Sequence, residues 1–404
     1  MVALAVVAVV LAFALLARRR SRRFRLAGGL ALAGHLAFAL VVLPLLPYTW
    51  DIGEFHGIAT GLLRGAEANP FSSLDAFGTV QAVLYAMFGA DPTTLSVVNG
   101  LLAVLMALPA CYLARRLYDP LESTDGLLLA VLFLPFPFLF SSLPMRDALS
   151  TLLALTLLAV CVRAIADRRR WWALTAPPLW AMLFLLREEL ALLVLLGATG
   201  SLLVAGLQRV ADREVTLASL ALAGVPVGVA GFALFTRLFP VDALNSRLQY
   251  RIMGGAAYLG FERYGSWLDV LLAAPVRAIY FQFAPFPLHV DSAFDLVAVL
   301  SLPLLVVLAT AAYLTLRRVE HDPVVAFPLL VVYLGGVVGY GLIDSNFGTT
   351  IRHRSVFVFL LAVFAAPALE SWWRSLRLRV EEPLGQRRDR DEHQREAEEL
   401  DAGA

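Results

Sequence analysis

Two carboxylates and an imidazole lie close together near residue 50, shortly after an apolar run. Asp51, Glu54 and His56 follow the apolar stretch 27–46. Asp51 and Glu54 are three residues apart, so a helical turn places both carboxylates on one face. Ionisable groups at the mouth of a membrane helix are costly and are commonly retained for function. The pattern predicts acid–base chemistry at a membrane surface, on a molecule that a lipid delivers.

The same two carboxylates have two other interpretations. With Asp51 as N-cap and Glu54 at the third helical position, they imitate a capping box. Their oxygens also suit a divalent cation such as Mg²⁺ or Mn²⁺. Two carboxylates are few for such a site, so the sequence leaves metal binding open.

Arginines accompany acidic residues where other apolar runs begin or end. A guanidinium is always charged, and its planar fork matches the oxygens of a phosphate. Arginines at the same depth as carboxylates therefore predict a site for an anionic headgroup, such as a lipid-linked phosphate. The groups are Arg146 with Asp147; Arg187 with Glu188 and Glu189; Arg247 and Arg251; and Asp344, Asn346, Arg352, His353 and Arg354.

Structural interpretations of these residues also stay open. Asp147 is suited to the first turn of a helix, where it complements the helix dipole. Arg187 can form an ion pair with an adjacent glutamate that holds two span ends together. The polar stretch 346–350 is interpreted as a loop that shapes the pocket.

The remaining basic residues also have structural alternatives to a functional role. Arg352 and Arg354 can extend toward lipid headgroups while their stems stay in apolar surroundings. His56 and His353 can be neutral imidazoles that only form hydrogen bonds.

The composition requires a membrane around these residues. The chain has 404 residues, of which 59% are hydrophobic, and its mean hydropathy is +0.74. Apolar runs of about 20 residues are long enough to cross about 30 Å of hydrocarbon as helices. We therefore expect an all-α polytopic membrane protein with about eleven transmembrane helices. The expected spans are 2–17, 27–46, 94–114, 125–141, 147–166, 172–186, 189–207, 216–238, 292–316, 324–343 and 355–372.

The positions of the arginines predict the orientation. The printed sequence contains no lysine, and its arginine clusters all fall on one side if the N-terminus is outside. The positive-inside rule makes that side the cytoplasm, so the C-terminus is cytoplasmic and the protein lies in the plasma membrane. This assignment requires a break within 172–207. The first apolar run precedes its arginines, the reverse of a signal peptide, and predicts an anchor.

The same pattern divides the chain into three parts. Residues 1–24 form an additional anchor and a basic loop, 25–380 the transmembrane domain, and 381–404 a charged, disordered tail. Extracytoplasmic loops are expected at 47–92 and 240–291. Apolar residues at helical spacing predict two amphipathic interfacial helices in the first of these loops.

Several functional classes are not indicated. The two cysteines, Cys111 and Cys161, match no metal or redox spacing and are expected to be free thiols. The sequence has no phosphate-binding loop, dinucleotide fingerprint, zinc spacing or nucleophile elbow. Arginines on the predicted cytoplasmic side follow from topology, so they require no nucleic-acid partner.

Taken together, these motifs resemble the GT-C superfamily, the polytopic glycosyltransferases that use polyprenyl-phosphate sugars. The similarity lies in the acidic motif at 51–56, the segment 58–65 after it, Arg146-Asp147 at the start of a span, 285–287 before another, and 348–354 before the last. It covers nearly all of the membrane part but not the tail. An extra span precedes the acidic loop, and the two acids are not adjacent as in several relatives.

The resemblance implies transfer of a sugar from a polyprenyl phosphate to a lipid, glycan or protein acceptor outside the cell. It implies that Asp51, with a pKa raised by its apolar position, is the base and that Glu54 supports it or binds a metal. The residues expected to bind the substrate or its phosphate are Arg146, Asp147, Arg251, Arg352, Arg354, His56 and His353. Expected partners are the lipid-linked donor, membrane lipids and other envelope-glycan assembly proteins. The alternatives are an O-antigen-type polymerase or ligase and a lipid-linked glycan transporter.

Overall fold

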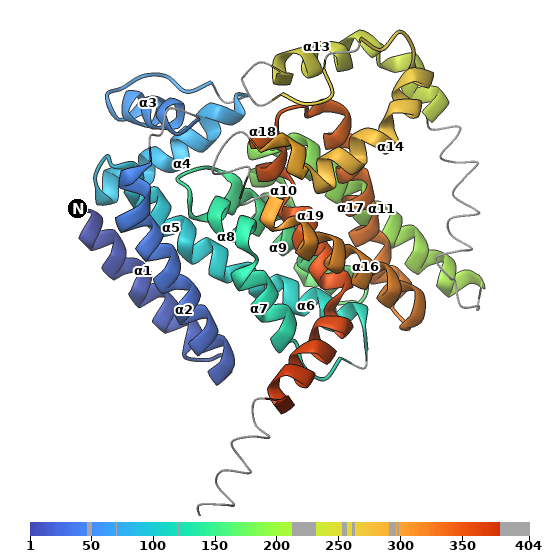
Figure 1. Cartoon of the computed structure of the whole chain (residues 1–404), viewed down its shortest axis with the longest axis horizontal. Helices are drawn as coiled ribbons and strands as arrows, with labels where there is room; N and C mark the ends of the chain where they lie inside the picture. The colour runs from blue at the N-terminus through green and yellow to red at the C-terminus, as the bar shows by residue number, and fades with distance from the viewer. Residues whose placement is uncertain are drawn as a thin grey trace, which may run out of the picture.

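The chain is described by a computed structural model that covers residues 1–46, 51–69, 71–119, 121–211, 232–252, 257–260, 263–290, 296 and 299–379. Within these ranges every regular element is a helix. An isolated β-bridge also joins Ala257 and Asn346. The expected all-α class is therefore confirmed for the described residues. Figure 1 shows helices α3 and α13 across the top of the helical body, whereas the C-terminal helical segment, in red, ends at the bottom.

The helices differ widely in length. The α-helices are α1 (Val2–Ala17), α2 (Arg22–Ala37), α3 (Asp51–Leu63), α4 (Ser73–Phe88), α5 (Pro92–Leu105), α6 (Ala107–Leu117), α7 (Asp125–Phe133), α8 (Pro135–Ser142), α9 (Asp147–Ile165), α10 (Ala176–Leu186), α11 (Glu188–Ala211), α13 (Val241–Ile252), α14 (Trp267–Phe283), α16 (Leu302–Arg318), α17 (Pro323–Ile343), α18 (Phe347–His353) and α19 (Ser355–Phe364). A short π-helix at Phe38–Val42 and a short 3₁₀ helix at Leu43–Leu45 extend α2.

Among the described residues, five helices are long and apolar enough to cross a membrane, and the number rises to seven if each of two bent pairs is one span. The bent pairs are α7 with α8, at 53°, and α18 with α19, at 42°. Pro135 begins α8, and a proline ring disfavours helical geometry in the residue before it, which explains the first bend. This length and composition is that of a polytopic membrane protein.

The prediction of eleven spans is confirmed only in part. The predicted spans 27–46, 94–114, 147–166, 189–207 and 324–343 coincide with the five long helices, and 125–141 and 355–372 overlap the bent pairs. The segment 2–17 forms α1, which is shorter than a typical span. The segment 172–186 yields only the 11 residues of α10. The segment 292–316 yields α16, and most of 216–238 lies outside the described residues.

The expected break within 172–207 falls at Arg187. Its backbone, at φ −151° and ψ 80°, separates α10 from α11. The Nε1–H of Trp180 on α10 donates to the carbonyl oxygen of Ala191 on α11 at 3.0 Å, so the two helices lie against each other. The turn therefore places the Arg187 side chain at the end of a helix pair.

Helix α19 is the centre of the packing, because all ten of its residues are buried. Close contacts need small residues around it. At Gly336 of α17, an added Cβ would lie 2.0 Å from the ring of Phe357. At Gly341, it would lie 2.8 Å from the carbonyl oxygen of Arg277 on α14. The first contact shows that α17 packs closely against α19, and the second that it packs closely against α14.

Arginines from the start of α2 and the end of α6 lie together at one end of the body, which is named the arginine-rich end. An arginine at the start of α2 contacts an acidic residue of α7, and an arginine at the end of α6 contacts an acidic residue just after α9. The residue before α17 forms a backbone hydrogen bond with the end of α6. The contacts are Arg23 with Asp125, Arg116 with Asp167 at 2.6 Å, and the amide nitrogen of Asp322 with the carbonyl oxygen of Leu117 at 3.0 Å. Asp51 and Arg352 lie toward the other end.

The two helices predicted in the first loop exist as α3 and α4, and they pack against each other. Phe55 and Phe77 meet edge to face at 4.8 Å between ring centroids, and both are buried. Ala59, Ala82 and Tyr85 form a second small cluster between the two helices. The apolar stripes therefore face inward and hold the start of α3 in a defined place.

Large apolar side chains cover much of the outer surface. Leu195, Leu196, Leu202 and Leu203 of α11 are exposed, and α14 exposes a similar set. Contiguous apolar surface of this extent is rare on soluble monomers, so a bilayer accounts for it.

The start of α7 provides a test of the packing. A Cβ at Gly126 would lie 2.4 Å from the carbonyl oxygen of Leu369, while the amide of Gly126 donates to the carboxylate of Glu370 at 2.7 Å. We predict that Gly126→Ala lowers the free energy of unfolding by about 1–3 kcal/mol, because overpacking forces backbone shifts.

Reversible unfolding in mixed micelles measures this effect. Gly206→Ala is the matched control, since nothing lies within 4 Å of its Cβ position, and it should leave stability unchanged or raise it by about 0.5–1 kcal/mol. Equal stability of the two variants would contradict the packing argument.

Candidate functional site

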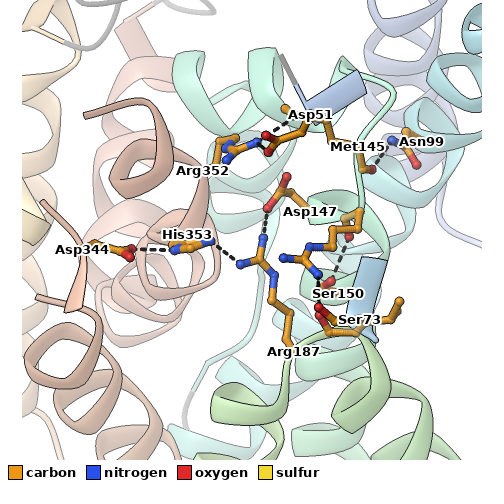
Figure 2. Close-up of polar contacts among 12 residues, drawn as sticks. Asp51, Ser73, Asn99, Met145, Asp147, Ser150, Arg187, Asp344, Arg352 and His353 are labelled. Carbon is orange, nitrogen blue, oxygen red and sulfur yellow. Dashed lines mark hydrogen bonds and ion pairs between the residues drawn. The ribbon is translucent and has the colours of Figure 1, made fainter. Parts of the chain in front are cut away.

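The carboxylate of Asp51, at the start of α3, forms an ion pair with the guanidinium of Arg352 on α18 (Figure 2). Arg352 Nη1 also donates to the sulfur of Met145 at 3.2 Å. The Asp51 side chain is 42% exposed and that of Arg352 is 14% exposed. The first loop is thereby joined to the segment before the last span, with an accessible carboxylate at the junction.

Arg187 lies at the centre of a second group of contacts. One of its terminal nitrogens pairs with the carboxylate of Asp147, and the other donates to Nε2 of His353 (Figure 2). Both side chains of the Arg187–Asp147 pair are less than one tenth exposed. The guanidinium therefore connects α9, the α10–α11 turn and α18 inside the protein.

The contacts of His353 define its protonation state. Its Nδ1 lies 2.6 Å from the carboxylate of Asp344, and its Nε2 accepts from Arg187. A guanidinium has only donors, so Nε2 must be the unprotonated nitrogen and Nδ1–H donates to Asp344. The two hydrogen bonds of His353 are those of a neutral imidazole.

Arg146 lies beside these pairs but contacts only neutral groups among the described residues. Its Nη1 donates to the hydroxyl of Ser73 at 2.9 Å and to the carbonyl oxygen of Leu186 at 3.2 Å. Its guanidinium also lies 5.9 Å from the centroid of the Phe55 ring. Burial and the neighbouring Arg187 cation lower the pKa of Arg146 to about 10, so it is still charged at neutral pH.

Hydrogen bonds to the turn before α9 hold these groups in place. The side-chain amide of Asn99 on α5 donates to the carbonyl oxygens of Leu143 and Met145, at 2.7 and 2.8 Å. The hydroxyl of Ser150 donates back to the carbonyl oxygen of Arg146 at 2.9 Å. The turn presents the Met145 sulfur to Arg352 and the guanidinium of Arg146 to Ser73.

The predicted rise in the pKa of Asp51 is wrong. Burial does raise the pKa of this carboxyl, but the charge and hydrogen bond of Arg352 outweigh burial, with help from Arg146 and Arg187. The pKa is therefore held below its ordinary value. In this state Asp51 is a stable anion and a weak base.

A polar cavity of about 630 Å³ opens next to Arg146 and Arg187. Ser73 lines it from α4, and Arg247 lines it from α13. Arg247 pairs with Glu188 at 3.0 Å and with Glu189 at 3.3 Å. These two glutamates pair with Arg247, whereas Arg187 pairs with Asp147.

Three of the predicted site residues do not join the cluster. Glu54 is exposed and has no hydrogen bond or ion pair among the described residues. His56 Nδ1 lies 2.9 Å from the hydroxyl of Tyr85, inside the α3–α4 pair. Arg354 is fully buried, and it donates to the carbonyl oxygens of Gln282 and Ala284 at 2.9 and 2.7 Å.

Two further expectations concern Arg251 and the stretch 346–350. The Arg251 side chain lies outside the described residues. The stretch is not a loop, because Asn346 caps the short helix α18 and accepts from the amide of Thr349 at 3.4 Å.

The site also contains residues that the sequence did not assign to it. Arg187 and Asp344 belong to the arginine and carboxylate groups noted in the sequence, but neither was expected to be catalytic or to bind the substrate. Neither Ser73 nor Met145 carried any signal. Across the part of the chain that the structure describes, no three His, Cys, Asp or Glu side chains come together as in a metal site. The arrangement offers guanidinium groups for an anion and one accessible carboxylate beside them.

No family model matches the chain, and neither does any curated protein.

The Arg187–Asp147 pair is expected to dominate local stability. Asp147→Leu leaves the buried guanidinium without its anion, and breaking such a pair costs about 3–5 kcal/mol. The double variant Asp147→Leu/Arg187→Met should recover at least half of that loss, because no unpaired charge stays buried. Unfolding of each variant in mixed micelles measures this, and a loss below about 1 kcal/mol for Asp147→Leu would contradict it.

The Asp51–Arg352 pair predicts a titration. Because the folded pKa of Asp51 is depressed, the pair stabilises the protein above the unfolded pKa of about 3.9, and that contribution disappears as the pH falls through the folded value. Arg352→Gln should raise the pKa of Asp51, because it removes the positive charge that offsets the effect of burial. Carbodiimide labelling of Asp51 against pH, read by mass spectrometry, follows this change; an unchanged midpoint would contradict the assignment.

Proposed function

We propose that the chain is an integral membrane glycosyltransferase of the GT-C type, which moves a sugar from a polyprenyl phosphate to an acceptor hydroxyl. The observation that carries the proposal is the ion pair of Asp51 and Arg352 beside Arg146, a half-buried cation that forms no ion pair with a carboxylate among the described residues. An acidic side chain and a cation that is not in a direct ion pair are the two groups that such a transfer needs.

The arginines suit the phosphate of the donor. Arg146 lies at a polar cavity with Arg187, and its hydrogen-bond partners are a hydroxyl and a carbonyl oxygen. A phosphate there would gain charge-assisted hydrogen bonds in surroundings from which water is partly excluded. The end of the body that holds the site is opposite the arginine-rich end, which supports an extracytoplasmic position under the positive-inside rule.

The reaction follows from these roles. The bond between sugar C1 and the phosphate oxygen breaks, and its electron pair leaves with the polyprenyl phosphate. The acceptor oxygen forms the new bond to C1 from the opposite face, with inversion. Its proton passes to Asp51, and the charge that develops on the leaving phosphate is stabilised by Arg146 and Arg352.

Donor binding explains how a weak base becomes an effective one. A phosphate that engages Arg352 competes with Asp51 for the same guanidinium. When the Asp51–Arg352 ion pair breaks, the effect of burial is no longer offset by the guanidinium, and the pKa of Asp51 rises. Asp51 thus gains basicity only when the donor is present, which limits proton transfer to the loaded enzyme.

The test uses purified protein in lipid with a panel of labelled polyprenyl-phosphate sugars and a membrane extract as acceptor. Release of free polyprenyl phosphate is measured. We predict that wild type releases it and that Asp51→Asn is slower by about 10²–10⁴-fold, the usual contribution of a general base. Glu67→Gln, which removes an exposed acid from the same loop, is the matched control and should behave as wild type.

The alternatives predict different results. A polymerase or ligase would use diphosphate-linked substrates and would tolerate the loss of Asp51. A transporter would move the lipid without releasing polyprenyl phosphate. An active Asp51→Asn variant, or a folded wild type that releases nothing from any donor, would contradict the proposal.

A further inference from the structure

A second large cavity lies at the arginine-rich end of the body, away from the candidate site. It has a volume of about 780 Å³ and runs between the α1–α2 junction, α6, α7 and α9. Arg163 of α9 lines it, whereas Asp147 at the other end of α9 belongs to the candidate site. At about 1.5 Å per residue these two residues are about 24 Å apart along the helix, so the cavities are separate.

The deep part of this cavity is mostly apolar. Leu152, Thr156, Ala159 and Val160 line it from one face of α9, and α6 and α7 add apolar residues opposite. From Leu152 to Arg163 the groove follows α9 for about 16 Å, which is about half of a 30 Å hydrocarbon layer. Its length along the helix therefore matches the depth of one leaflet.

The outer part of the groove is basic. Four arginines line it, and the single lining carboxylate, Asp125, is already in an ion pair with Arg23. The lining arginines are Arg19, Arg20, Arg115 and Arg163. The groove therefore presents an excess of positive charge at the level where an apolar lining ends.

Aromatic groups shape the boundary between these two parts. The guanidinium of Arg163 lies 4.4 Å from the ring centroid of Tyr112 and 4.6 Å from that of Trp172. Trp172 also lines the groove, and its buried Nε1–H has no hydrogen-bond partner in the described structure. A donor of this kind beside arginines suits an anionic oxygen at the membrane interface.

We propose that this groove binds one anionic phospholipid from the leaflet at the arginine-rich end. An acyl chain lies along α9, and the phosphate lies among Arg19, Arg20 and Arg115. The length of the apolar lining along α9 favours a lipid over a soluble anion. The unbalanced positive charge accounts for selection of an anionic over a zwitterionic headgroup.

The experiment uses the full chain in detergent micelles doped with phosphatidylglycerol or phosphatidylcholine, with bound lipid counted by native mass spectrometry. Wild type should retain one phosphatidylglycerol in preference to phosphatidylcholine. Arg19→Gln/Arg20→Gln should weaken that binding by about thirtyfold, since each arginine near anionic lipid contributes about a factor of five. Arg18→Gln/Arg25→Gln removes two exposed arginines of the same segment that do not line the groove, and should change binding less than threefold.

A third variant tests the acyl-chain part. Thr156→Trp fills the groove without changing charge and should also release the phosphatidylglycerol, while added inorganic phosphate should not compete with it. Equal losses in the two arginine pairs would show diffuse surface attraction and overturn the proposal. Equal retention of the two lipids by wild type would overturn it as well, whatever the folding of the tryptophan variant.

Discussion

A single buried guanidinium, that of Arg187, connects parts of the chain that are far apart in sequence. It lies at the break between α10 and α11, pairs with Asp147 at the start of α9 and donates to His353 at the end of α18. A buried charge without its partner is strongly destabilising, so these helix ends must meet in one arrangement. That arrangement places Arg146 and Arg352 near each other and brings Asp51 from the first loop to Arg352.

Much of the scaffold could be predicted, because a bilayer requires long uninterrupted apolar helices. The runs 147–166 and 324–343 coincide with α9 and α17, and the break needed within 172–207 falls at Arg187. The sorting of arginines also predicted that Arg146, Asp147, Arg352 and His353 lie near one end of the spans, and these residues do belong to one cluster. Shorter runs such as 2–17 were less informative, because an apolar composition does not define how far a helix extends.

The pairing within the cluster could not be predicted, because it depends on helix rotation and on contacts distant in sequence. Arg352 and Arg354 are two residues apart, so a helix directs them about 200° apart; one reaches Asp51 and the other is buried against carbonyl oxygens. The pKa of Asp51 shows most clearly what local sequence cannot predict. Its apolar surroundings predicted a raised pKa, but Arg352, 301 residues away in the chain, lowers it.

The central claim is that the cations around Arg146 form a phosphate site and that the phosphate releases Asp51. The most direct measurement is an electron cryo-microscopy structure of the protein in nanodiscs with a long-chain polyprenyl phosphate. The account predicts phosphate density about 3 Å from the guanidinium nitrogens of Arg146 and Arg352, with the carboxylate of Asp51 turned away from Arg352. Lipid phosphate bound elsewhere, with the Asp51–Arg352 pair intact, would contradict it.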